Sequence, residues 1–164
     1  MNKVVYVISA TMIWAAVLLV AVPSTEAQSP QSLSLTAPSA AKKAHRLILQ
    51  VNTNDQATMN LALNNATNVE QYYKSVGEKV EIEVVTFGPG LHMLRDDTSP
   101  VKARIATIAM STPAITFKAC GNTQSNMSKA ENKQIALISA ATVVKSGVVR
   151  VMELQEKGWA YVRP

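Results

Sequence analysis

Short apolar segments alternate with amphipathic stretches along most of this 164-residue chain, from His45 to the carboxyl terminus. The apolar segments have the length of strands, and the stretches between them repeat apolar residues at steps of three and four. This alternation is typical of an α/β sheet whose faces are covered by helices. We therefore predict a three-layer α/β/α domain built on a mainly parallel five-stranded sheet.

The pattern also places the individual elements. Strands are predicted at 46–51, 80–87, 114–120, 142–144 and 159–162. Helices are predicted at 56–76, 91–96, 101–110, 128–138 and 147–157. Asp55 and Ser146 have the side chains that cap helix starts, and Gly77 and Gly158 stand where a left-handed residue ends a helix.

The amino-terminal segment is predicted to direct export. Lys3 precedes a long apolar run that ends at Pro23, and Thr25 and Ala27 match the small residues before a signal-peptide cleavage site. Residues 1–27 are therefore interpreted as a signal peptide. The run approaches the roughly 20 residues that span a bilayer, so retention as a membrane anchor is the alternative. In either case the rest of the chain faces an exported compartment, of which a bacterial periplasm is the simplest choice.

Residues 28–44 are rich in Ser, Pro, Ala and Gln, which predicts a flexible tether before a single domain at 45–164. The net charge is +5, but only 16% of residues are charged and no Lys/Arg cluster is present. Nucleic-acid binding favours a basic stripe with stacking aromatic residues. Export and the absence of such a stripe exclude nucleic acid as the expected partner.

Cys120 is the only cysteine of the chain, so no intramolecular disulfide can form. It closes the predicted strand 114–120, and the Asn52–Asn54 and Gly88–Gly90 turns close two others. Carboxyl ends of parallel strands share one edge, where ligands bind in open α/β sheets. Lys118 lies on the same side of its strand as Cys120, roughly 7 Å away, and would favour the thiolate.

The residues leave two interpretations of Cys120 open. Beside the backbone amides of a turn and the start of a helix, its thiol would be reactive. Unpaired cysteine is also among the residue types that are most often buried, so simple packing is the alternative. No metal site or cofactor is predicted, because Met59, Met110 and Met152 fall on helical apolar stripes and are expected to fill the core.

Several stretches taken together resemble a known family, the exported periplasmic branch of the DsrE/DsrF-like proteins. They are HRLILQVNTND, LALNNATNV, VEIEVVTFGPGLHML, ITFKACGNT and SGVVRVMELQEKGWAYVRP. The resemblance covers about His45 to Pro164 and depends on the order and spacing of these stretches. Members with this glycine-proline-glycine turn often have a histidine before it, whereas this chain has Phe87.

The resemblance implies a three-layer domain that assembles into homo-oligomers such as trimers or hexamers. In cytoplasmic sulfur-relay members, the cysteine after the corresponding strand carries a persulfide, and Cys120 matches that place. Cys120 would then be the nucleophile and Lys118 a thiolate stabiliser. The crevice around them would be formed by Asn54, Gly88, Gly90, Gly121 and Asn122.

The residues and the resemblance therefore predict two alternative functions. The first is a periplasmic sulfur carrier that acts through Cys120. The second is a non-catalytic homo-oligomeric domain that binds a small anion, a sulfur compound or a metal in the same crevice. A membrane partner is expected only if the amino-terminal segment is retained.

Overall fold

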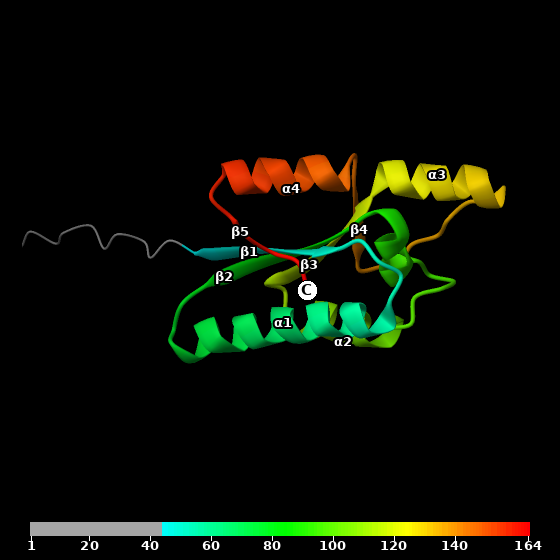
Figure 1. The fold of residues 1–164 in the computed structure, drawn as a ribbon. Helices are drawn as coiled ribbons and strands as arrows, with labels where there is room; N and C mark the ends of the chain where they lie inside the picture. Colours follow the sequence, from blue (N-terminus) through cyan, green and yellow to red (C-terminus); the bar gives the residue numbers. More distant parts are fainter. Residues whose placement is uncertain (1–43) are drawn as a thin grey trace, which may run out of the picture. The chain divides into compact units, whose positions relative to one another are not determined.

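The computed structural model describes residues 44–164 (Figure 1). The predicted signal peptide at 1–27, and the predicted tether except for its last residue, lie outside this range. The elements are β1 (His45–Val51), α1 (Gln56–Ser75), β2 (Val80–Thr86), the 3-10 helix η1 (Gly88–Leu94), α2 (Lys102–Ser111), β3 (Ile115–Cys120), α3 (Gly121–Glu131), β4 (Ala141–Val144), α4 (Gly147–Glu156) and β5 (Ala160–Val162). No helix between residues 44 and 164 is both long enough and apolar enough to cross a membrane.

The five strands form one parallel sheet in the order β4-β3-β2-β1-β5. Parallel neighbours need a crossover connection, which the helices supply. Helices α1 and α2 lie on one side of the sheet, and α3 and α4 lie on the other (Figure 1). This arrangement confirms the predicted three-layer α/β/α fold.

Alternate residues of the central strands contribute to two separate hydrophobic cores, one on each face of the sheet. Leu49 and Val84 point toward α1 and α2 and belong to the larger core, in which Met59 is fully buried. Ile48 and Val85 point the other way and pack against α4. Apolar residues occur on both faces of these strands because both faces are covered.

Local sequence signals set the ends of α1 as predicted. The Asp55 carboxylate accepts a hydrogen bond from the backbone N–H of Thr58 at 2.7 Å, which is the geometry of a helix cap. Just beyond the other end, Gly77 has a φ of +70°, a conformation that glycine adopts without steric cost.

Two predicted helices begin earlier than expected. The helix predicted at 128–138 is α3, which starts at Gly121 because the Cys120 side chain caps it, and ends at Asn132 in the left-handed conformation. Residues 133–138 instead form an irregular segment whose Ile135 and Ile138 are buried. The helix predicted at 91–96 is η1, which starts at the glycine-proline-glycine turn itself.

Two methionines were wrongly assigned to the core. Met110 is 87% exposed and Met152 is 55% exposed, whereas Met59 is buried as predicted. Each of the two helices is covered on one side only, and that side is filled by Ile105 of α2 and Val151 of α4. Apolar spacing identifies a helix but does not say which apolar residue faces the sheet.

A buried guanidinium ties the end of η1 to the end of α3. The Arg95 side chain is only 1% exposed and donates to Asp97 at 2.9 and 2.8 Å and to Glu131 at 2.8 Å. Lys133 adds an ion pair with Asp97 at 2.9 Å. Loss of one partner from such a cluster leaves a buried charge uncompensated, so the cluster fixes the position of α3.

Hydrogen bonds from Arg95, supported by Lys133, lower the pKa of Glu131 to about 2 and hold the pKa of Asp97 well below its usual range. A carboxyl group whose pKa is depressed by folding stabilises the protein above its unfolded pKa, and this contribution is lost as the pH falls.

We expect the free energy of unfolding to decrease from about pH 5 to about pH 2 as Glu131 and Asp97 become protonated. The variant Glu131→Gln should lose less stability over this range because glutamine has no charge to lose. Urea unfolding followed by circular dichroism at a series of pH values measures the effect. Glu156→Gln, a change of an exposed carboxylate on α4, is the control. Equal pH dependence in wild type and Glu131→Gln would contradict the assignment.

Candidate functional site

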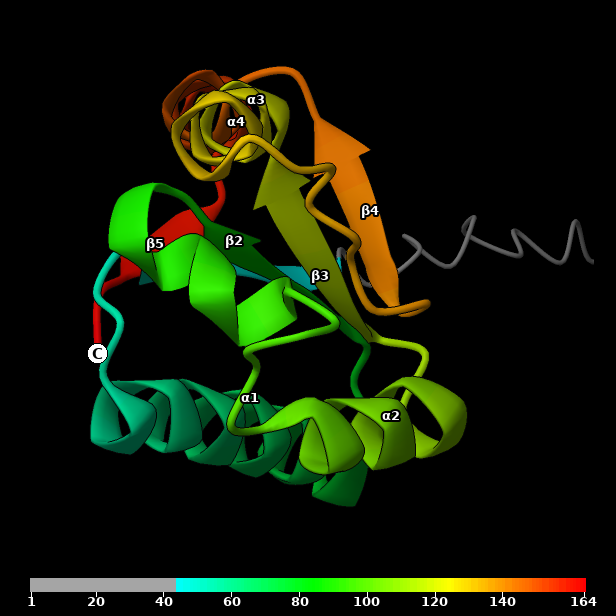
Figure 2. The same cartoon turned by 90° about the vertical axis from the view of Figure 1, so that its right-hand side faces the viewer.

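The ends of three neighbouring strands lie side by side at the carboxyl edge of the sheet. Cys120 ends β3, the Gly88–Gly90 turn follows β2, and the Asn52–Asn54 turn follows β1. Figure 2 looks onto this edge, where η1 and the starts of α3 and α4 gather around the ends of the strands. The structure therefore brings the predicted crevice residues to one edge, as parallel strands require.

Two helices begin beside Cys120. Helix α3 starts at the next residue, and α4 starts at Gly147, where β4 has run alongside β3 with Val144 paired to Cys120. The two helices run in opposite directions from this point, so their amino termini face each other (Figures 1 and 2). Helix amino termini carry positive partial charge and unpaired N–H groups.

Several of these N–H groups act on the Cys120 sulfur. It caps α3 by accepting the backbone N–H of Thr123 at 3.5 Å. The backbone N–H groups of Gly147, the first residue of α4, and of Asn122 also lower the pKa of Cys120, while the Asn122 N–H donates its hydrogen bond to the Lys145 carbonyl at 3.2 Å. The sulfur therefore caps α3 and lies beside the amino terminus of α4.

Thr123 connects this sulfur to the glycine-proline-glycine turn. Its hydroxyl oxygen accepts the backbone N–H of Gly88 at 3.0 Å, and its side chain is also hydrogen-bonded to Cys120. A hydroxyl has one proton, so a hydroxyl that accepts from Gly88 can donate that proton to the sulfur. Gly88 itself has a φ of +54°, which suits glycine.

These donors decide the acidity of the thiol. Burial is the largest single influence and raises the pKa of Cys120. The hydrogen bonds from the Thr123 side chain and from the backbone of Gly147, Thr123 and Asn122 together outweigh it, so the pKa of Cys120 lies below its ordinary value. The environment therefore favours the thiolate.

The sulfur is nevertheless closed off from solvent, because Cys120 is only 4% exposed. A Cβ atom added at Gly147 would lie 2.8 Å from Phe87 Cδ1 and 3.2 Å from Cys120 Cβ. Phe87, Gly147 and Cys120 thus pack without space for another carbon atom. Each of the two sequence interpretations describes part of this site, since the thiol is buried and is also surrounded by donors.

Lys118 lies on the same face of β3 as Cys120, two residues earlier, and is half-buried. Its side chain makes no hydrogen bond or ion pair within residues 44–164, and it is not among the groups that lower the pKa of Cys120. Its predicted role as a thiolate stabiliser stays a prediction, while backbone amides and Thr123 provide the stabilisation that the structure shows.

The remaining predicted residues have different roles in the packing. Gly90 is buried, and a Cβ there would lie 2.1 Å from the Val51 carbonyl oxygen, so it allows η1 to approach the end of β1. Gly121 has Val143 Cγ1 at 3.1 Å from the position of a Cβ. Asn54 is exposed before α1, and its side chain makes no hydrogen bond with the described part of the chain.

Sequence reasoning missed Thr123 and Gly147 as site residues. The spacing of Cys120 and Thr123 is that of a cap and the third helical residue, which is a detectable signal for the start of α3. Gly147 lies 27 positions after Cys120, and only the pairing of β3 with β4 brings the two together. No local pattern could have shown that contact.

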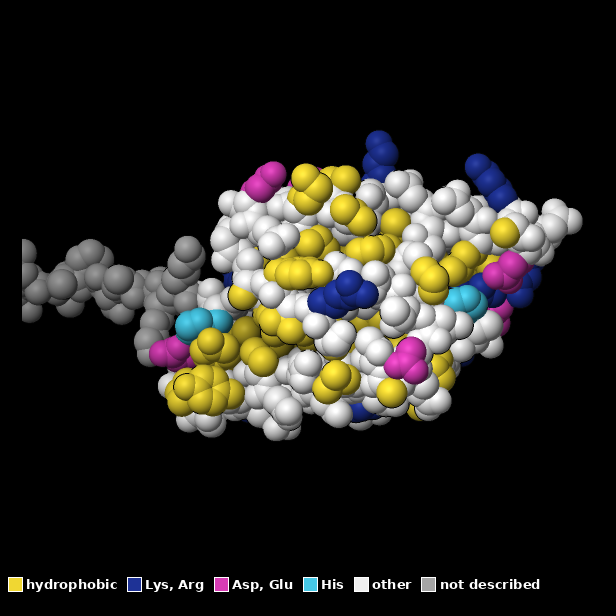
Figure 3. Space-filling model, viewed as in Figure 1, with side chains coloured by type: hydrophobic (Ala, Val, Ile, Leu, Met, Phe, Trp, Pro, Cys, Tyr) yellow, Lys and Arg dark blue, Asp and Glu magenta, His cyan; other side chains and the backbone are white. Residues whose placement is uncertain are grey.

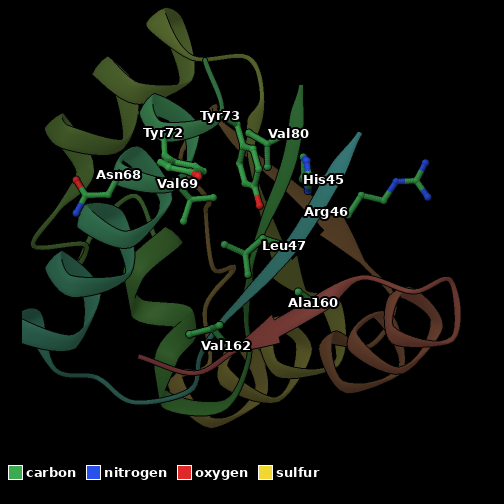
Figure 4. A pocket seen from close by; sticks show the side chains of 10 residues that line it. All are labelled: His45, Arg46, Leu47, Asn68, Val69, Tyr72, Tyr73, Val80, Ala160 and Val162. Carbon is green, nitrogen blue, oxygen red and sulfur yellow. The ribbon is translucent and has the colours of Figure 1, made fainter. Parts of the chain in front are cut away.

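A separate cavity of about 440 Å³ lies at the opposite end of the strands (Figure 4). Side chains from α1, β1 and β5 line it, including Tyr72, Tyr73, Leu47 and Val162. The His45 ring stacks on Tyr73 with centroids 3.9 Å apart. This cavity is mostly apolar and far along the strands from Cys120. Among residues 44–164, no group of three or more His, Cys, Asp or Glu side chains is placed to hold a metal ion.

No protein-family model matches the chain, and no curated protein matches it. A solved structure with a similar fold is that of MTH1491, a protein of unknown function from Methanobacterium thermoautotrophicum. The two chains are 29% identical over 73% of this chain and 99% of that chain, with a TM-score of 0.62. The likeness supports the fold and leaves the activity to be argued from the site.

Removal of the Thr123 hydroxyl should raise the pKa of Cys120. In Thr123→Val the sulfur loses a donor, so the rate of alkylation by iodoacetamide at pH 7 should fall several-fold. Thr123→Ser retains the hydroxyl and should keep the wild-type pH profile. The measurement is the alkylation rate of the folded protein as a function of pH. Identical profiles in wild type and Thr123→Val would show that this hydroxyl does not act on the thiol.

Gly147→Ala should destabilise the protein, because the added methyl group meets Phe87 and Cys120. Overpacking of this kind costs about 1–3 kcal/mol in the free energy of unfolding. Val148→Ala changes the next, exposed residue of α4 and is the matched control. Urea unfolding measures both variants, and equal stability of the two would contradict the tight contact.

Proposed function

We propose that this protein is a periplasmic sulfur carrier of the DsrE/DsrF-like type that holds a persulfide on Cys120. The observation that carries the proposal is the position of Cys120 between the amino termini of α3 and α4, where its sulfur accepts the backbone N–H of Thr123 and where Gly147 of α4 packs against it and lowers the pKa of the thiol. The sequence resemblance described above supports the same residue. Export is proposed from the amino-terminal segment, which lies outside the described residues.

The reaction requires one thiolate and a donor of sulfane sulfur. With thiosulfate, the Cys120 thiolate attacks the outer sulfur atom, a new S–S bond forms, and the old S–S bond breaks with its electron pair on the departing sulfite. The negative charge then rests on the outer sulfur of the persulfide. No second cysteine is needed, because a carrier passes this sulfur on to an acceptor thiol.

The burial of Cys120 has two consequences for such a carrier. A sulfur atom bound there would be shielded from stray thiols and from oxidation, which threaten an exposed thiolate in an oxidising compartment. Loading would require the Phe87 side chain or the first turn of α4 to move, because both pack against the cysteine. The transfer of sulfur to Cys120 would therefore be slow without a partner or ligand that opens this contact.

The same burial favours the second candidate function, a non-catalytic homo-oligomeric domain in which Cys120 is a packing residue and a helix cap. Homo-oligomers such as trimers or hexamers are proposed for either function. Exposed apolar side chains on α1 and β5, among them Leu61, Tyr72 and Val162, support self-association. Figure 3 shows apolar side chains gathered on the face that carries these elements.

Exposure of the purified protein to thiosulfate or polysulfide, followed by intact mass spectrometry, tests the first function. We expect wild type to gain the mass of one sulfur atom, released again by a reducing thiol, and Cys120→Ala to gain none. An unmodified wild type with a thiol pKa at or above about 8.5 would reject the carrier. Sulfur addition that persists in Cys120→Ala would reject it as well.

A further inference from the structure

A second cavity, of about 540 Å³, lies along the start of α4 and outside the packed cysteine site. Asn122 and Ser146 line it, and each directly precedes in sequence a residue that contacts Cys120, Thr123 and Gly147 respectively. Arg150 and Glu153 line it farther along α4. The cavity therefore extends from the neighbourhood of the sulfur to polar side chains about 10 Å away, given the rise of a helix over seven residues.

Arg150 is held in a fixed orientation at this cavity. Its Nε and Nη2 donate to the Glu83 carboxylate at 2.9 and 2.5 Å, and Glu83 is buried on β2. Its Nη1 makes no hydrogen bond with residues 44–164. A guanidinium bound side-on in this way keeps Nη1 as an oriented donor for a carboxylate.

The charges around the cavity are mixed. Lys145 and Arg150 are cationic, whereas Glu153 is anionic and stands three residues after Arg150 on the same helix. Glu83 already balances one of the two positive charges. A multiply charged anion would be repelled by Glu153, so the lining is better matched to a ligand that carries both a carboxylate and an ammonium group. Val144 and Val149 supply apolar wall between the charged groups.

We propose that this cavity binds a sulfur-containing α-amino acid, as the sulfur donor for Cys120. The carboxylate would lie on Lys145 and Nη1 of Arg150, the ammonium group on Glu153, and the sulfur-bearing side chain would extend toward Ser146. This inference rests on the proposed carrier function of Cys120, and it names the class of donor that the function leaves open.

The transfer step is balanced without an added oxidant or reductant. The Cys120 thiolate attacks the outer sulfur of the amino-acid persulfide, and a new S–S bond forms. The old S–S bond breaks, its electron pair leaves on the inner sulfur as the thiolate of the amino acid, and the proton stays on the transferred sulfur. Occupancy beside Ser146 also places the donor against the first turn of α4, which is one of the two groups, with the Phe87 side chain, whose movement would expose the thiolate.

Binding is tested with S-methyl-L-cysteine, which has the head group of the donor but cannot transfer sulfur. In calorimetric titration we expect saturable binding to wild type, and affinity weakened about two- to fivefold in Glu153→Gln, as for loss of one exposed ion pair. The control Glu156→Gln changes an exposed carboxylate of α4 outside the cavity and should bind as wild type does. The contact with the ligand carboxylate is tested with Lys145→Gln, which should weaken the binding of S-methyl-L-cysteine to a similar extent. Its control, Lys157→Gln, should bind as wild type does.

The analogue 3-(methylthio)propionate lacks the ammonium group and should bind more weakly to wild type, and Glu153→Gln should not weaken its binding further, because that change only removes a carboxylate that repels it. No saturable binding of S-methyl-L-cysteine, or equal effects of Glu153→Gln and Glu156→Gln, would overturn the inference.

Failure of this inference is separable from failure of the proposed function. If wild type gains sulfur from thiosulfate but does not bind S-methyl-L-cysteine, the assignment of the donor is wrong, whereas the proposed carrier function is supported. If S-methyl-L-cysteine binds with the expected variant pattern but neither thiosulfate nor cysteine persulfide adds sulfur to Cys120, the carrier and the donor assignment fall together.

Discussion

The structure is organised around the meeting of two helix amino termini at one sulfur atom. The N–H groups at the start of each helix need acceptors, and the Cys120 sulfur accepts one from α3 while Ser146 caps α4 beside it. The contact demands a residue without a side chain at Gly147, and it places Phe87 against the cysteine. The acidity of the thiol and its isolation from solvent are two results of this one arrangement.

Each of the two helices is anchored elsewhere by a guanidinium and a carboxylate. Arg95 holds Glu131 at the far end of α3, and Glu83 of the central strand β2 holds Arg150 of α4. Both pairs are partly or fully buried, where the removal of one partner is costly. The ion pairs therefore keep the two amino termini in register with the sulfur, although neither touches it.

Protection and access oppose each other at this site. Cys120 is only 4% exposed, which protects its sulfur from oxidation and from stray thiols, yet a donor must reach that sulfur for the carrier function. The mixed-charge cavity beside the first turn of α4 offers a place where a ligand could act on the same turn that covers the cysteine. Binding and opening would then be linked through α4.

Periodicity and residues a few positions apart were enough to predict the α/β class, the strand positions, the caps at Asp55 and Ser146 and the breaks at Gly77 and Gly158. The same patterns placed Cys120 at the carboxyl edge. The packing of Gly147 and Phe87 against Cys120 and the pairing of Arg150 with Glu83 could not be predicted in this way. Those contacts join residues far apart in the chain, and they exist only once β3 and β4 pair and α4 packs on the sheet. The exposure of Met110 likewise depends on which side of α2 the sheet covers.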